Sequence, residues 1–266
     1  MKKKSSKLNI LVMSCDKNVM LLNVFFKYLF KHIDVSCFNI YLSLEKEKYN
    51  YKDYFINVIN CSNNDFSYRL YYSLGCINSK SVILLLDDFI IEDRIDYNEL
   101  CFLNNVLLDN IDIAAFIFSK VYYPENNNIY YRNFHLLKRY AKYKLCLQAS
   151  LWRIDILRGL LNNHENPWEI EIFGTMRTYN DNKKYYSINS KSLSPIKYND
   201  GFYVLQGKVN TLERIRLEKK FNDNFKIAGM TENNGEIVRD SVGLINRILR
   251  RIRIIINYIR YRYIKV

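Results

Sequence analysis

Two adjacent aspartates, Asp87 and Asp88, directly follow a run of five apolar residues at 82–86. That run is too short for an ordinary helix and fits a strand that is buried on both faces. Ligands of open α/β sheets bind beyond the carboxyl ends of the strands. Two carboxylates there can hold a divalent cation, and the cation can hold a diphosphate. The alternative is that they only solvate the strand end or cap a turn.

Asp16 and Arg69 are further candidates at the same edge of the expected sheet. Asp16 follows another apolar run, residues 8–14, and could accept hydrogen bonds from a ribose hydroxyl or a base amide. It could also cap the following helix, and the two roles are compatible. Arg69 precedes the strand at 82–86 and could bind a diphosphate if it points to this edge. The alternative for Arg69 is a solvated surface position.

Three acids surround a tryptophan in the segment 164–171: Glu165, Glu169 and Glu171 lie beside Trp168. Burial by the indole could raise a carboxylate pKa and produce a general base, and tryptophan also stacks on sugar rings. The alternative is an acidic first helical turn that complements the helix dipole. Lys208 follows Gly207, where a flexible loop could close on a phosphate, or it is a solvated lysine.

Several familiar motifs are missing from the sequence. No Cys and His spacing typical of a metal site occurs, and no Gly-x-Ser-x-Gly elbow, P-loop or Gly-x-Gly-x-x-Gly is found. The six cysteines form no Cys-x-x-Cys pair, which favours free thiols in a reducing compartment. The usual marks of hydrolases, P-loop NTPases and dinucleotide-binding dehydrogenases are therefore absent.

The first 120 residues alternate between short apolar runs and helical periodicity. The expected strands are 8–14, 35–43, 54–61, 81–86 and 111–119, and the expected helices are 19–32, 65–74 and 96–109. This alternation predicts a mostly parallel sheet flanked by helices. The later pattern is looser and predicts strands at 143–149 and 202–206 and helices at 151–161, 168–179 and 209–221.

The net charge of +13 is concentrated at the two ends of the chain. A nucleic-acid-binding domain would carry such charge on its folded body, so we expect no nucleic acid partner. Residues 243–266 combine an apolar stripe at helical spacing with six arginines and Lys265, and no acid follows Asp240. This pattern is typical of a helix that lies on an anionic membrane surface, although a terminal helix docked on the protein body is the alternative.

We therefore expect an α/β domain at 1–221, a linker at 222–242 and a basic amphipathic helix at 243–266. The basic start and the following apolar run faintly resemble a bacterial lipoprotein signal, but the run is shorter than the roughly seven to fifteen residues that such signals need. A first strand is preferred there. No run reaches the ~18 apolar residues typical of a membrane-spanning helix.

Taken together, several short motifs resemble a group of bacterial glycosyltransferases with a GT-A-like, Rossmann-like fold that act in capsule, O-antigen and surface polysaccharide biosynthesis. The motifs cover about residues 8–210 and occur at 14–17, 67–70, 84–89, 148–153, 167–171 and 207–208. The Asp-Asp-Phe strand end and the Trp-Glu-x-Glu segment are the most specific of them.

The resemblance implies a nucleotide-diphosphate sugar as donor, with a UDP-sugar favoured. Asp16 and Arg69 would contact the donor, and Lys208 would steady the leaving diphosphate. Asp87 and Asp88 would hold Mn²⁺ or Mg²⁺. Their adjacency departs from the family's Asp-x-Asp spacing, which leaves the metal and the choice of ligand open.

On the acceptor side, the resemblance implies that Gln148, Trp152 and Trp168 line the site. Glu171, or failing that Glu169, would act as the general base of an inverting displacement, although retaining chemistry stays open. A glycan built on a polyprenyl diphosphate would be the acceptor. The basic helix would then hold a cytoplasmic, peripheral protein on the inner face of the membrane.

Two rival hypotheses also fit the sequence. One is a basic membrane-binding or nucleic-acid-binding protein without catalysis. The other is a different nucleotide-sugar-using enzyme, such as a phosphosugar transferase.

Overall fold

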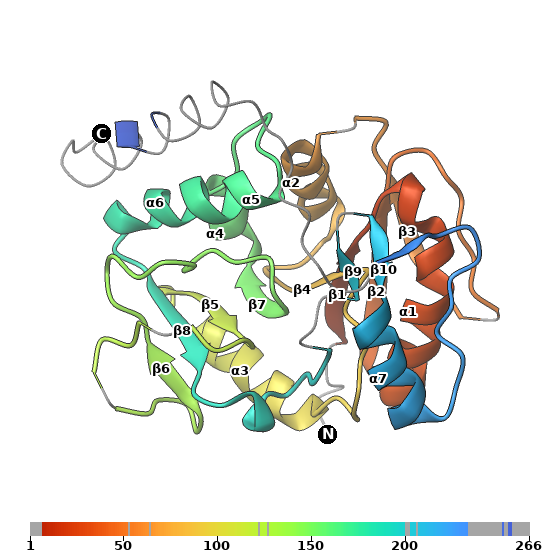
Figure 1. The fold of residues 1–266 in the computed structure, drawn as a ribbon. Helices are drawn as coiled ribbons and strands as arrows, with labels where there is room; N and C mark the ends of the chain where they lie inside the picture. The colour runs from red at the N-terminus through yellow and green to blue at the C-terminus, as the bar shows by residue number, and fades with distance from the viewer. Residues whose placement is uncertain are drawn as a thin grey trace.

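The computed structural model describes residues 7–52, 54–63, 65–121, 123–126, 128–199, 203–205, 207–233, 252, 255 and 256. Its centre is an eight-stranded sheet with the strand order β3-β2-β1-β4-β7-β5-β8-β6 (Figure 1). The strands are β1 (Leu8–Met13), β2 (Phe38–Leu44), β3 (Asn57–Asn60), β4 (Ser81–Leu86), β5 (Ile113–Ile117), β6 (Phe134–Leu136), β7 (Ser150–Arg153) and β8 (Lys184–Ile188).

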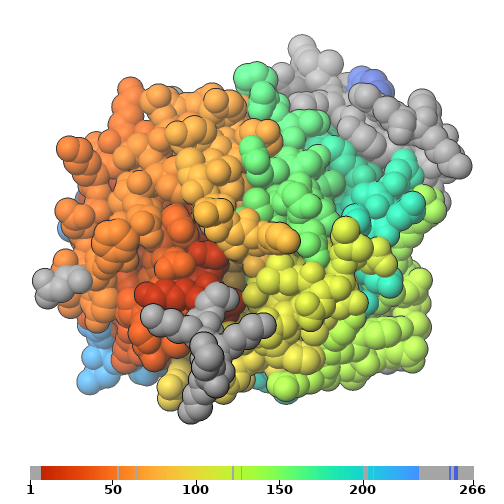
Figure 2. Space-filling model, turned by 180° about the vertical axis from the view of Figure 1, so that it is seen from behind, coloured from red at the N-terminus to blue at the C-terminus, as the bar shows by residue number. Residues whose placement is uncertain are grey.

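Most of the sheet is parallel, as the sequence predicts. Strands β3, β2, β1 and β4 run in one direction, and β5 and β8 are parallel to each other. Only β7 and β6 are antiparallel to their neighbours, and β7 joins the two halves between β4 and β5. Figure 2 shows this division from behind, with the early segments (red to orange) beside the later ones (yellow to green).

Helices cover both faces of the sheet. One face packs against α1 (Val19–His32) and α3 (Tyr97–Asp109) through a cluster that includes Phe25, Leu103 and Ile83. The other face packs against α2 (Phe66–Cys76) and α4 (Ile154–Gly159). Because both faces are covered, apolar residues predominate in β1, β4 and β5, which explains why β4 lacks polar alternation.

A smaller layer lies outside α1 (Figure 1). It contains the three-stranded sheet β11-β10-β9 and the helix α7 (Thr211–Phe221). The strands are β9 (Val204–Leu205), β10 (Lys208–Asn210) and β11 (Glu232–Asn233). Phe225, inside the expected linker, is fully buried in a cluster with Tyr28 and Leu217. The described part of that linker, residues 222–233, therefore packs against the domain.

The predicted elements of the first 120 residues are confirmed, with boundaries shifted by a few residues. The prediction of a strand at 143–149 is wrong, because the strand β7 begins at Ser150 and the preceding residues form turns. The helix predicted at 151–161 is consequently shorter and begins at Ile154. The strands β6 and β8 were not predicted.

The predicted helix at 168–179 is confirmed as one helical segment with changing pitch. It comprises α5 (Pro167–Glu169), a π-helical turn (Ile170–Gly174), α6 (Thr175–Arg177) and a final 3₁₀ turn (Thr178–Asn180).

The predicted basic helix at 243–266 lies outside the described residues, apart from Ile252, Ile255 and Ile256. These three residues are helical and exposed. No described helix has the length and hydropathy needed to cross a bilayer.

Candidate functional site

Asp87 and Asp88 lie directly beyond β4, at the edge where the neighbouring strand β1 also ends. The strand order reverses here, since β2 and β4 lie on opposite sides of β1. Asp87 is 7% exposed, and its Oδ2 accepts hydrogen bonds from Ser14 Oγ at 2.6 Å and Asn18 Nδ2 at 3.0 Å. The loop after β1 thus fixes Asp87 at a position typical of ligand binding in open α/β sheets.

The carboxylate of Asp88 is less well satisfied by hydrogen bonds than that of Asp87. Its Oδ1 is buried and has no hydrogen-bond partner among the described residues. Burial, together with the neighbouring Asp87 carboxylate, raises the pKa of Asp88 to about 7. Burial also raises the pKa of Asp87 to about 6, against the opposing hydrogen bonds from Ser14 and Asn18. A pair of carboxylates in this state would gain from a nearby positive charge.

The carboxylate of Asp16 binds backbone amides of the loop after β2. It accepts hydrogen bonds from the N–H groups of Glu45 and Lys46, each at 3.0 Å. Burial raises the pKa of Asp16, but hydrogen bonds from Glu45 and from these amides outweigh that effect and lower it overall. No side-chain cap from Asp16 to its own helix is formed, so Asp16 instead ties the ends of β1 and β2 together.

The side chain of Arg69 also binds neighbouring groups of the protein. Its side chain is 4% exposed, and Nη1 donates to the carbonyl of Ser14 at 2.7 Å and lies 3.0 Å from Glu45 Oε1. The guanidinium group therefore holds the loops after β1 and β2 from within. It lines neither of the cavities described below.

The helical segment that begins at Pro167 carries the tryptophan and the glutamates. Asn166 caps it by accepting the Glu169 N–H at 3.0 Å, and Glu169 Oε2 accepts the Asn166 N–H at 3.2 Å. This capping box occupies Glu169. Trp168 and Glu171 are three residues apart and so share a helix face. Glu165, by contrast, is 3% exposed and pairs with Arg177 at 2.6 Å.

The loop before β7 is fastened to that helix face. Glu171 Oε1 accepts the Leu147 N–H at 2.8 Å, and the Leu145 N–H donates to Thr175 Oγ1 at 3.1 Å. Burial raises the pKa of Glu171, although the Leu147 N–H partly opposes this. Gln148 Oε1 accepts from Tyr198 Oη at 2.6 Å, which orients the glutamine amide.

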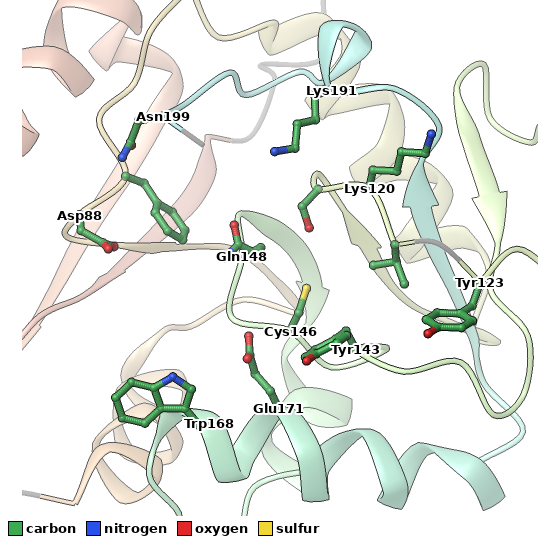
Figure 3. Close-up of a pocket in the computed structure, with 13 residues that line it drawn as sticks. Asp88, Lys120, Tyr123, Tyr143, Cys146, Gln148, Trp168, Glu171, Lys191 and Asn199 are labelled. Carbon is green, nitrogen blue, oxygen red and sulfur yellow. The ribbon is translucent and has the colours of Figure 1, made fainter. Parts of the chain in front are cut away.

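Two cavities of about 650 Å³ and 620 Å³ meet at these residues. The residues lining both are Asp88, Phe89, Gln148, Trp168 and Glu171. Beyond this common wall, the smaller cavity reaches Asn18, Asp87 and Gly207, on the side of β1. The larger extends toward Lys120, Tyr143 and Lys191 (Figure 3). The structure thus brings the aspartates, Trp168 and Glu171 together around one hollow.

Trp152 and Lys208, like Asp16, Arg69 and Glu169, are predicted site residues that line neither cavity. Trp152 is fully buried in β7, its indole N–H donates to Ser150 Oγ at 2.8 Å, and it lines neither cavity. It is therefore a core residue and not a contact for an acceptor. Lys208 is exposed at the start of β10 and is not among the lining residues, although Gly207 beside it is. Gly207 has a φ of +76°, which favours glycine.

Sequence reasoning missed Lys120, Lys191 and Asn199, which line the larger cavity. Lys120 follows β5 as Asp87 follows β4, so the same strand-end signal could have identified it. Lys191 follows β8 in the 3₁₀ turn Lys191–Leu193. Because β8 was not predicted, no sequence signal placed Lys191 at this edge.

The described residues include no group of three or more His, Cys, Asp or Glu side chains that could hold a metal ion. The unpartnered Oδ1 of Asp88, with Asp87 beside it, does fit one or two carboxylate ligands of Mn²⁺ or Mg²⁺. The remaining ligands would then be oxygens of a bound diphosphate and of water, as is usual for Mg²⁺.

No protein-family model matches the sequence, and no curated protein sequence matches it. Solved structures with a similar fold include the mannosyltransferase PcManGT from Pyrobaculum calidifontis in complex with GDP-Man and Mn²⁺ (10% identity, TM-score 0.46, covering 69% of this chain and 54% of that one). S. aureus TarS 1–349 in complex with UDP is 11% identical with a TM-score of 0.45, and the match covers 68% of this chain and 60% of that one. The apo-form glycosyltransferase GlyE from Streptococcus pneumoniae TIGR4 is 12% identical with a TM-score of 0.47, and the match covers 82% of this chain and 61% of that one. The chain thus spans about 54–61% of these three chains. Likenesses this distant assign no activity.

Proposed function

We propose that this protein is a GT-A-like glycosyltransferase that moves a sugar from a nucleotide-diphosphate sugar to a hydroxyl group of a surface glycan. The observation that carries the proposal is the common wall of the two cavities. Asp88, Trp168 and Glu171 border both cavities, and Asp87 borders the smaller one. Two substrates in adjoining cavities would meet at this wall, which is what a transfer reaction requires.

The donor occupies the smaller cavity, which lies beside the switch point of the sheet. There Asn18 and Asp87 supply polar groups, and the backbone at Gly207 leaves room for close approach, since no atom of the described residues, its chain neighbours aside, lies within 4 Å of a Cβ atom at that position. Asp16 and Arg69 act indirectly by fixing the loops around the donor. A divalent cation held by Asp88 and Asp87 would neutralise the charge of the diphosphate.

The acceptor occupies the larger cavity, with its hydroxyl group near Glu171. The Glu171 carboxylate takes the hydroxyl proton as the acceptor oxygen forms its bond to the anomeric carbon of the sugar. The bond from that carbon to the diphosphate oxygen breaks, and its electron pair leaves with the diphosphate. Glu171 suits this role because burial raises the pKa of its carboxyl group, which makes the carboxylate a stronger base. Trp168, 66% exposed, offers a ring surface on which a sugar can stack.

Attachment to an anionic membrane through residues 243–266 completes the proposal. An acceptor built on a polyprenyl diphosphate would be presented at such a surface. UDP-sugars are the favoured donors. A single displacement by the acceptor hydroxyl, with Glu171 as the base, inverts the anomeric carbon.

Thermal stabilisation by nucleotide sugars tests the proposal. A donor present at about 100 times its Kd stabilises the folded state by about 2.7 kcal/mol, which raises the melting temperature. We expect UDP-sugars or GDP-sugars to do so and Mn²⁺ to enlarge the effect, whereas CMP-sugars, which carry a single phosphate, serve as the control. The Asp88→Asn variant should lose the Mn²⁺-dependent part. If no nucleotide sugar shifts the melting temperature, with or without Mn²⁺, the proposal is wrong.

A further inference from the structure

One corner of the larger cavity presents a buried amide donor without a partner. Asn199 is 3% exposed, and its Oδ1 accepts the Ile90 N–H at 2.6 Å. That bond fixes the orientation of the amide. Its Nδ2 has no hydrogen-bond partner among the described residues, and Asn199 lines the cavity. An unpaired buried donor is costly, so this group favours a ligand that brings an acceptor atom.

Two lysines lie at the same side of this cavity. Lys191 and Lys120 follow β8 and β5, which are neighbouring parallel strands, so both come from the same edge of the sheet. In Figure 3 the Lys191 ammonium group points toward the space between Asn199 and Gln148. The Lys120 side chain is exposed, and its ammonium group points away from Glu171 in this view.

The cavity is lined by charged residues on several sides, and in Figure 3 Asp88 lies below Asn199. The acids among its described lining residues are Asp88 and Glu171, and the cations are Lys120 and Lys191. Figure 3 shows Glu171 beside Trp168, across the cavity from the two lysines. A neutral sugar could contact Glu171 and Trp168 but would bring no anion to the ammonium groups on the opposite side.

We propose that the acceptor carries an anionic group, a carboxylate or a phosphate, that binds between Asn199 Nδ2 and the ammonium group of Lys191, with Lys120 as a second cation. This inference rests on the proposed glycosyl transfer and names the class of acceptor. Hydrogen bonds from a charged donor to an anion are stronger than neutral ones, so these residues determine specificity.

The donor diphosphate is the other anion that could use these groups. Asn199, Lys120 and Lys191 line the larger cavity and are not among the described residues lining the smaller one. The smaller cavity holds Asn18, Asp87 and the Gly207 backbone, at the switch point of the sheet. The positions therefore favour the acceptor as the source of the anion.

The test compares alkyl glycosides that differ only at carbon 6 of the sugar. Octyl glucoside, octyl glucuronide and octyl glucoside 6-phosphate, and the same sets in the galacto and manno series, are titrated into the full chain at 150 mM salt. Binding is followed by ligand-observed NMR, which requires no turnover. The variants are Lys191→Met, which keeps the apolar stem, and Lys197→Met. Lys197 is the matched control because it pairs with Asp93 at 3.0 Å and lines neither cavity.

We expect at least one anionic glycoside to bind about tenfold or more tightly than its neutral counterpart, the size expected for one charged hydrogen bond. The preference should shrink to less than threefold in Lys191→Met and persist in Lys197→Met. The carboxylate and phosphate arms identify the group. Equal binding of neutral and anionic glycosides, or a preference that survives in Lys191→Met, overturns the inference.

The glycoside titration and the nucleotide-sugar melting measurement together separate this inference from the proposed function. If nucleotide sugars stabilise the protein but the glycosides show no anion preference, only the inference fails. If Lys191→Met weakens nucleotide-sugar binding by the factor expected for the acceptor, Lys191 belongs to the donor site and the inference is wrong. If no nucleotide sugar binds, the proposed function fails.

Discussion

Glu169 and Glu171 are two residues apart on one helical segment, but their carboxylates have different surroundings. Glu169 completes a capping box with Asn166, whereas Glu171 lines both cavities and accepts the Leu147 N–H. The family resemblance favoured Glu171 over Glu169 as the base, but the residues alone left the choice open. The two positions differ in the helix cap, because Glu169 lies three residues after the N-cap Asn166, as a capping box requires, and Glu171 does not.

The Glu171→Gln variant should transfer sugar about 10²- to 10⁴-fold more slowly, the usual contribution of a general base. The glutamine keeps the shape of the side chain and can still accept the Leu147 N–H, so the fold should be retained. Glu169→Gln is the matched control, because glutamine also serves in a capping box. Turnover of a radiolabelled nucleotide sugar measures both variants. Equal losses in the two variants would contradict the role given to Glu171.

The raised pKa of Glu171 also sets the direction of two pH effects. The carboxylate form is the base, so the rate should rise with pH through a value above the ordinary glutamate pKa. The folded state holds the Glu171 proton more tightly than the unfolded state, so this group lowers stability as the pH rises through that window. Glu171→Gln should therefore melt at or above the wild-type temperature at neutral pH, and the difference should vanish in acid. A lower melting temperature at neutral pH would show that Glu171 mainly supports the fold.

At the scale of the elements, local pattern was sufficient for the first half of the chain and for two helical segments of the second, but not for the later strands of the large sheet. Strand β4 and helix α1 could be predicted because their apolar residues follow the periods of a buried strand and a helix. Strand β7 could not, because its pairing joins Ser81 to Arg153 and depends on a long-range contact. The buried residues Leu145 to Leu147 read as a strand, but Thr175 and Glu171 hold this segment as a loop.

Arg69 shows how such ties between elements can be tested. Replacing it with methionine removes the partner of Glu45, whose side chain is 13% exposed, and frees the carbonyl of Ser14. Removing one member of a buried pair costs about 3–5 kcal/mol. We expect a loss in this range in urea unfolding, and partial recovery when Glu45→Gln is added.

Arg94→Met is a control at an exposed position and should change the unfolding free energy by less than about 0.5 kcal/mol. If Arg69→Met instead left stability unchanged and raised the KM for the donor, direct binding of the diphosphate by Arg69 would be supported.

Across the whole molecule, the sheet places two halves of the chain edge to edge. Strands β1 and β4 bring Asp87 and Asp88 to the hollow, and the later segment brings Gln148, Trp168 and Glu171 to its other side. From sequence, the aspartates and the Trp-Glu-x-Glu segment could be predicted separately. Their meeting depends on β7 inserting between the halves, and that insertion leaves no local mark in the sequence.

The charge of the whole chain leads to the last prediction. Residues 243–266 contain seven basic residues and no acid, and each basic group near an anionic leaflet contributes about 1 kcal/mol to binding. The full chain should therefore sediment with vesicles that contain phosphatidylglycerol, less so at 0.5 M salt, and not with vesicles of phosphatidylcholine alone. A chain ending at residue 242 should stay in the supernatant.

A variant with Arg247, Arg250, Arg251 and Arg253 changed to glutamine separates charge from apolar burial, since it keeps every apolar residue of the segment. It should lose most of the binding if headgroup charge drives attachment. If the truncated chain sediments as well as the full one, the membrane contact lies on the α/β domain, and the acceptor would have to be presented there.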